Sequence, residues 1–113
     1  MSHKPLKVAI AGIGGYGSKH HHAFNQLEKD GAVKVIATCD PRLEELTQEI
    51  TLYELRSRQV ALYRDFNEMI SRHENELELV TLATPIHLHA AMHRACVERD
   101  IPCYVEKPPT LDP

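Results

Sequence analysis

Runs of apolar residues alternate along the chain with stretches in which apolar positions recur every three or four residues. Five runs are rich in β-branched or small apolar residues, which is typical of strands buried in a sheet; they span residues 6–11, 33–39, 60–63, 77–83 and 101–105. Four segments between them have helical spacing, and they span residues 16–29, 42–58, 66–73 and 87–99.

This alternation predicts an α/β protein with a doubly wound parallel sheet, a Rossmann fold, with right-handed crossovers and helices on both faces. The expected strand order is 3-2-1-4-5, with a crevice above the carboxyl ends of the first and fourth strands. In the segment 42–58, Leu52 and Leu55 fall off the apolar stripe. We therefore expect this helix to bury a second patch or to bend.

Composition limits the size and class of the protein. The 113 residues amount to one domain, and we assign all of them (1–113) to it. A net charge of −3 argues against a nucleic-acid or membrane-surface partner, and no apolar run approaches the roughly 20 residues of a membrane span. Three cysteines without Cys-x-x-Cys spacing disfavour a disulfide scaffold or a zinc module, so we expect a reducing, cytoplasmic location.

The sharpest motif lies between the first predicted strand and the first predicted helix, at residues 12–17 (GIGGYG). It matches G-x-G-x-x-G, in which Gly12 permits the turn, Gly14 lets a diphosphate approach the main chain, and Gly17 lets helix and strand pack closely. Free amides and the positive end of the helix dipole then bind the phosphates. The cofactor-binding residues expected in this loop are Gly12, Ile13, Gly14, Gly15, Tyr16 and Gly17.

An acidic residue supports this interpretation. Asp40 ends the second predicted strand, about 20 residues beyond the last glycine, where the dinucleotide fingerprint has a carboxylate that binds the adenosine ribose. A carboxylate there repels a 2′-phosphate, so NAD is favoured over NADP. Arg42 leaves NADP open, because a guanidinium pairs with a 2′-phosphate or stacks on adenine. The alternative for both features is a glycine-rich turn with a helix-capping aspartate.

Four motifs in this order give the chain a resemblance to the Gfo/Idh/MocA oxidoreductases, which include glucose–fructose oxidoreductase and inositol dehydrogenase. The resemblance covers essentially the whole chain. The motifs are the glycine loop, Asp40-Pro41, Thr84-Pro85 with His89, and Glu106-Lys107-Pro108.

The resemblance implies hydride transfer between NAD or NADP and a sugar, cyclitol or related polyol. It implies that Glu106 contacts the nicotinamide ribose and that Lys107, the one expected catalytic residue, orients the substrate hydroxyl or assists its proton transfer. An ammonium group is suited to this, because it stabilises a developing alkoxide. The residues assigned to the cofactor beside its nicotinamide half are Thr84, Pro85, His87 and His89.

The chain also departs from the family pattern. Family members carry a second domain that supplies the substrate pocket and most oligomer contacts, and neither this domain nor a sixth strand of the sheet is recognisable here. Asp100 replaces a usual glycine, and residues 51–58 lengthen the second helical segment. We therefore interpret the chain as a cofactor-binding half that alone binds a dinucleotide weakly and catalyses little. Its polyol substrate would bind through the missing C-terminal domain, and a homo-oligomer is left open.

Three other functions compete with this interpretation. One is a non-catalytic nucleotide-sensing or interaction module whose last strand recruits a partner. Another is a Rossmann domain for a different adenosine ligand, such as S-adenosylmethionine. The third is a metal site, for which residues 20–22 (HHH) and the pair His89 and His93 are the candidates. We expect no metal, and we interpret these histidines as solvated or as neighbours of the cofactor.

Overall fold

The structure is a computed structural model that describes residues 4–84 and 86–105. One parallel sheet has the strand order β3-β2-β1-β4-β5, which confirms the predicted topology. Its strands are β1 (Leu6–Ala11), β2 (Val33–Cys39), β3 (Ala61–Tyr63), β4 (Leu79–Leu82) and β5 (Cys103–Val105).

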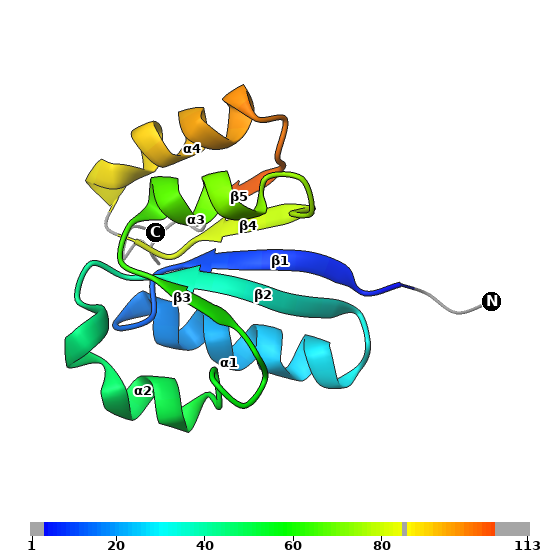
Figure 1. Cartoon of the computed structure of the whole chain (residues 1–113), viewed down its shortest axis with the longest axis vertical. Coiled ribbons are helices and arrows are strands. Elements are labelled where there is room, and N and C mark those ends of the chain that lie inside the picture. Colours follow the sequence, from blue (N-terminus) through cyan, green and yellow to red (C-terminus); the bar gives the residue numbers. More distant parts are fainter. Residues whose placement is uncertain (1–3, 85, 106–113) are drawn as a thin grey trace, which may run out of the picture.

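Helices cover both faces of the sheet, as predicted. Figure 1 shows α1 and α2 on one face and α3 and α4 on the other. None of the described helices has both the length and the apolarity to cross a membrane. The four helices are α1 (Tyr16–Lys29), α2 (Thr47–Leu52), α3 (Phe66–His73) and α4 (His89–Glu98).

Strand β1 lies in the middle of the sheet and separates two hydrophobic cores. Successive side chains of a strand point to opposite faces. Val8 and Ile10 lie in the core that contains residues of α2, whereas Ala9 and Ala11 lie in the core that contains residues of α3 and α4. All four side chains are fully buried, so the loop that follows β1 starts from a rigid base.

The second helical segment is shorter than predicted. A 3-10 turn (Leu43–Glu45) precedes α2, and turns follow α2 where the sequence predicted helix up to residue 58. The reason is burial: Leu55 is fully buried, whereas Leu52 is 70% exposed. The expected bend is therefore present, because the chain must turn inward after α2 to bury Leu55.

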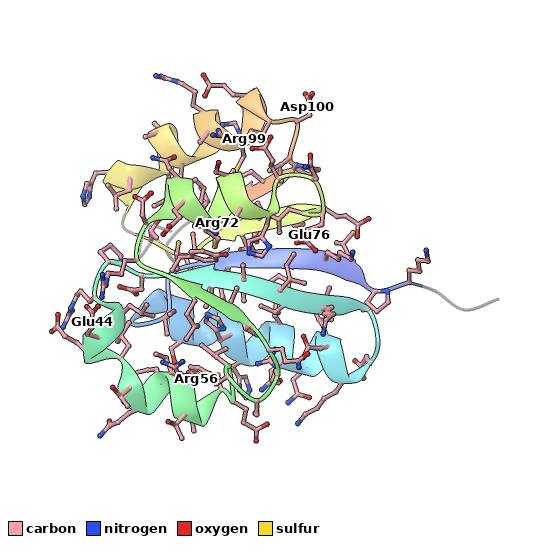
Figure 2. All side chains as sticks on the ribbon, in the orientation of Figure 1. Glu44, Arg56, Arg72, Glu76, Arg99 and Asp100 are labelled. Carbon is pink, nitrogen blue, oxygen red and sulfur yellow. The ribbon has the colours of Figure 1, made fainter. Side chains whose placement is uncertain are left out.

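The remaining elements match the prediction within two residues at their ends. The fourth helix begins as a 3-10 turn (Ile86–Leu88) and becomes α4 at His89. Asp100, which follows α4 (Figure 2), has a φ of 56°, in the left-handed region that favours glycine. This conformation explains why a glycine is usual at that position.

Candidate functional site

The glycine loop is fixed between the carboxyl ends of β2 and β4. The Gly12 amide donates to the Cys39 carbonyl at 2.7 Å. Gly12 has a φ of 111°, and a Cβ added there would lie 2.7 Å from the Ala83 carbonyl oxygen. Both the positive φ and this close approach require glycine.

The other loop glycines have different surroundings. A Cβ on Gly17 would lie 2.4 Å from the Gly12 carbonyl carbon, so α1 packs directly on the loop. A Cβ on Gly14 would lie 3.1 Å from Leu46 Cδ2, the end of a flexible side chain. Gly15 has a φ of 57° and open space where its Cβ would be. Gly17 is thus needed for packing, whereas Gly14 and Gly15 leave the main chain uncovered.

The Asp40 carboxylate is turned toward this loop. Its Oδ2 accepts hydrogen bonds from the amides of Ile13 at 3.0 Å and Gly14 at 3.2 Å, and its Oδ1 accepts from the Arg42 amide at 2.9 Å. Each carboxylate oxygen can accept more than one bond, so acceptor capacity remains for a ligand. At the start of α1, the amides of Gly17 and Ser18 already donate to the carbonyls of Gly14 and Gly15 at 2.9 and 3.1 Å. An anion at this helix N-terminus would therefore meet the remaining amides, those of Gly15 and Tyr16.

A buried histidine of α1, His21, contacts the main chain of the glycine loop. The Thr38 hydroxyl donates to the Ile10 carbonyl at 2.7 Å, so its oxygen accepts from His21 Nε2 at 3.1 Å. The same nitrogen lies 3.2 Å from the Gly12 carbonyl oxygen. Burial lowers the pKa of His21 to about 4, and the ring is therefore neutral near pH 7. A neutral imidazole thus holds the carbonyl of the first loop glycine.

Of the two alternatives for the three consecutive histidines, solvated or cofactor-adjacent, the first is wrong for His21. Its ring is 1% exposed and stacks on Tyr53, with ring centroids 5.5 Å apart. His20 is also buried, its Nδ1 lies 2.9 Å from Thr81 Oγ1, and it borders the cleft described next; His22 is exposed. Within residues 4–84 and 86–105, no three His, Cys, Asp or Glu side chains are grouped as metal ligands.

A cleft of about 960 Å³ runs along the carboxyl ends of the strands, beside the loop. Its size is at the upper end of the usual range for small-molecule sites. The main chain at Gly14 and Gly15, which carries no side chain, and the Asp40 carboxylate at the edge of the cleft suit the diphosphate and the ribose of a dinucleotide. The predicted residues that line it are Gly12, Gly14, Gly15, Asp40, Arg42, Thr84 and His89.

Other predicted residues lie elsewhere. The Ile13 side chain is fully buried in the core, so only its main chain faces the site. Gly17 lies behind the loop, and Tyr16 begins α1. His87 is exposed and is not among the residues that line the cleft. Pro85, Glu106 and Lys107 lie outside the described residues.

At the far end of the cleft, the segment after β4 is tied to α4. His89 Nε2 donates to the Thr84 carbonyl at 2.7 Å, and the Thr84 hydroxyl donates to Met92 Sδ at 3.3 Å. His89 is 9% exposed. Its Nε2 is thus engaged in positioning Thr84, whose side chain borders the cleft.

Sequence reasoning missed one wall of the cleft. The residues of this wall follow β2 and β3 in the sequence. Carboxyl ends of parallel strands meet at one edge of a sheet, so the end of β3 was a usable signal. Cys39 also lines the cleft, but burial raises the pKa of its thiol to about 12, so it is a neutral thiol. The missed wall residues are Glu45, Leu46, Glu49, Arg64, Asp65, Phe66 and Asn67.

Comparison with known proteins gives one family and several related structures. A family model described as an oxidoreductase family with an NAD-binding Rossmann fold matches residues 6–113. Inositol 2-dehydrogenase 4 of Saccharopolyspora erythraea is 30% identical over 112 residues, which are 99% of this chain and 31% of that protein. The chain therefore spans about a third of the length of this relative.

Two solved structures share the fold. The WlbA dehydrogenase of Chromobacterium violaceum, crystallised with NADH and UDP-GlcNAcA, has a TM-score of 0.76 and 19% identity; the match covers 96% of this chain and 29% of that one. The scyllo-inositol dehydrogenase of Lactobacillus casei, crystallised with NAD(H) and scyllo-inositol, has a TM-score of 0.71 and 24% identity; the match covers 96% of this chain and 30% of that one.

Proposed function

The chain belongs to the Gfo/Idh/MocA oxidoreductase family as its NAD-binding Rossmann part, and from this membership we propose that the protein transfers a hydride between NAD and a hydroxyl-bearing carbon of a sugar, cyclitol or related polyol. The observation that supports the cofactor half is the cleft, in which the glycine loop, free of side chains at Gly14 and Gly15, lies against the Asp40 carboxylate. Support for the substrate class comes from the inositol dehydrogenase that is 30% identical to the chain.

Five residues of the cleft have a proposed role. The loop amides around Gly14 and Gly15 bind the diphosphate, and Asp40 binds the adenosine ribose hydroxyls. Thr84 and His89 border the nicotinamide half, with His89 acting through its hydrogen bond to the Thr84 carbonyl. Three further assignments rest on the family motifs alone: Pro85 and His87 beside the nicotinamide and Glu106 at its ribose.

Bound NAD supplies the hydride acceptor. Lys107, by its place in the Glu-Lys-Pro motif, orients the substrate hydroxyl and assists the transfer of its proton; its ammonium form would stabilise the alkoxide so formed, which becomes the carbonyl as the hydride leaves the carbon. We propose that a further domain supplies the substrate pocket and any homo-oligomer contacts, because the chain spans 31% of its inositol dehydrogenase relative. We also propose a cytoplasmic location, in keeping with the free thiols of Cys39, Cys96 and Cys103.

The test is a K107A variant of the full-length protein, assayed with NAD and a panel of cyclitols and sugars. We expect kcat to fall by about a hundredfold or more, with little change in the Kd for NAD, because Lys107 acts on the substrate. The control is K34A, which removes an exposed lysine of β2. Full turnover by K107A contradicts the catalytic role. NAD binding without turnover of any polyol by the unmodified protein instead favours the non-catalytic module.

A further inference from the structure

Arg42 is the cation best placed to meet a phosphate on the adenosine ribose. Its amide donates to Asp40 Oδ1, so the two residues are joined at the edge of the cleft. A ribose held by Asp40 places its 2′-oxygen beside this pair. A 2′-phosphate, the group that distinguishes NADP from NAD, would therefore approach Arg42.

The Arg42 guanidinium is already engaged. Its Nη2 lies 3.2 Å from Glu45 Oε1 and its Nε lies 3.5 Å from Glu45 Oε2, so both carboxylate oxygens face it. The backbone favours this pair, because the Glu45 amide donates to the Arg42 carbonyl at 2.8 Å. In such a 3-10 turn, side chains three residues apart lie on the same side.

The turn is held beside the glycine loop by its buried neighbour. Leu46 is buried, and its Cδ2 lies 3.1 Å from the place of a Cβ on Gly14. Glu45, the residue before it, is thereby kept at the wall of the cleft. The ion pair thus belongs to the site and not to a remote surface.

The other charged residues of the cleft are mostly acidic. Arg64, the second arginine of the cleft, forms an ion pair with Glu44 of the same turn. The cleft therefore presents more negative than positive side chains to a phosphate, and both arginines are paired. The acidic residues that line it are Asp40, Glu45, Glu49 and Asp65.

We propose that Glu45 is a specificity-determining residue, which selects NAD over NADP by holding the Arg42 guanidinium away from a 2′-phosphate and by adding its own negative charge to the wall. This inference rests on the proposed cofactor role of the cleft. It assigns the selectivity to a residue outside the glycine loop and the ribose-binding carboxylate.

The test measures the Kd values for NADP and NAD by calorimetry in the unmodified protein, in E45Q and in R42A/E45Q. We expect E45Q to lower the ratio of the NADP Kd to the NAD Kd by about tenfold, which is the effect of one new charge-assisted phosphate contact. R42A/E45Q should lose this gain, because the contact is made by Arg42.

The matched control is E68Q. Glu68 pairs with Arg72 at 3.8 Å within α3, and neither residue lines the cleft. Figure 2 shows Arg72 on α3 and Glu44 on the turn before α2, on opposite sides of the sheet. E68Q removes the same charge from a similar exposed pair, so we expect it to leave the ratio of the two Kd values unchanged.

Two results overturn the inference. One is a ratio of the NADP Kd to the NAD Kd that is the same in E45Q as in the unmodified protein. The other is a lowered ratio that persists in R42A/E45Q or appears equally in E68Q. Such a result would reflect the change in net charge and not the release of Arg42. In both cases NAD binding by the unmodified protein leaves the proposed function intact. Failure of the unmodified protein to bind either dinucleotide would overturn the proposed function, and this inference with it.

Discussion

The glycine loop and the turn of residues 42–46 border the same cleft, but they are held by different kinds of contact. The loop is fixed by the close approach of Gly12 to Ala83 and by the buried imidazole of His21. The turn presents an exposed Arg42–Glu45 ion pair, with side chains 71% and 64% exposed. Buried contacts set geometry strongly, whereas exposed ion pairs contribute little to stability.

This difference separates two tasks of one site. The loop determines whether a dinucleotide fits at all, and its residues are therefore also residues of the core. The exposed Arg42–Glu45 pair of the turn determines which dinucleotide is favoured, and these two side chains can change without loss of the fold. Substitutions at Gly12 and Gly17 should therefore affect folding and binding together, a substitution at Gly14 should affect binding, and substitutions of the exposed pair of the turn should affect selectivity.

The largest expected effect is on the loop side, in a G17A variant. A methyl group at Gly17 would lie 2.4 Å from the Gly12 carbonyl carbon, so the backbone of α1 or of the loop must move. We expect a loss of more than about 3 kcal/mol in the free energy of unfolding, measured by urea denaturation.

The matched control for G17A is G31A. Gly31 has a φ of 79° and no atom within 4 Å of its added Cβ, so the cost there is conformational and amounts to about 1 kcal/mol. Equal losses in G17A and G31A would show that close packing of α1 on the loop contributes nothing.

The second expected effect is a pH dependence of stability that comes from His21, the buried histidine that contacts the glycine loop. Burial lowers the pKa of His21 from 6.5 to about 4. Below pH 6.5 the His21 imidazole is protonated in the unfolded chain but stays neutral in the folded protein. The free energy of unfolding therefore falls as the pH falls from 6.5 toward 4. Between about pH 7 and about pH 5 this difference removes roughly 2 kcal/mol, and the H21Q variant should lack this component.

Urea denaturation at the two pH values measures the His21 contribution. H22Q is the control, because His22 is the next residue of α1 and is exposed, so it should keep the wild-type pH dependence. The account of a neutral imidazole beneath Gly12 is wrong if H21Q and the unmodified protein lose stability equally on acidification.

The same division explains what the sequence could predict. The ranges of β1, α1 and β2 follow from apolar runs bounded by glycines and Asp40, and the structure reproduces them. The length of α2 did not follow, because burial of Leu55 is a tertiary effect that overrides helical spacing. The pairing of Arg42 with Glu45 depends on a 3-10 turn, which the spacing of apolar residues does not predict.

The most direct test of the glycine loop as the dinucleotide site is thermal and urea unfolding of the G14V variant with and without NAD. A Cβ at Gly14 meets only the Leu46 side chain, 3.1 Å from its Cδ2, and Gly14 has no positive φ; we therefore expect the fold to be kept while the approach to the main chain is blocked. NAD at about 100 times its Kd should stabilise the unmodified protein by about 2.7 kcal/mol and leave G14V unchanged. An equal gain in both proteins, or none in the unmodified protein, would contradict the account.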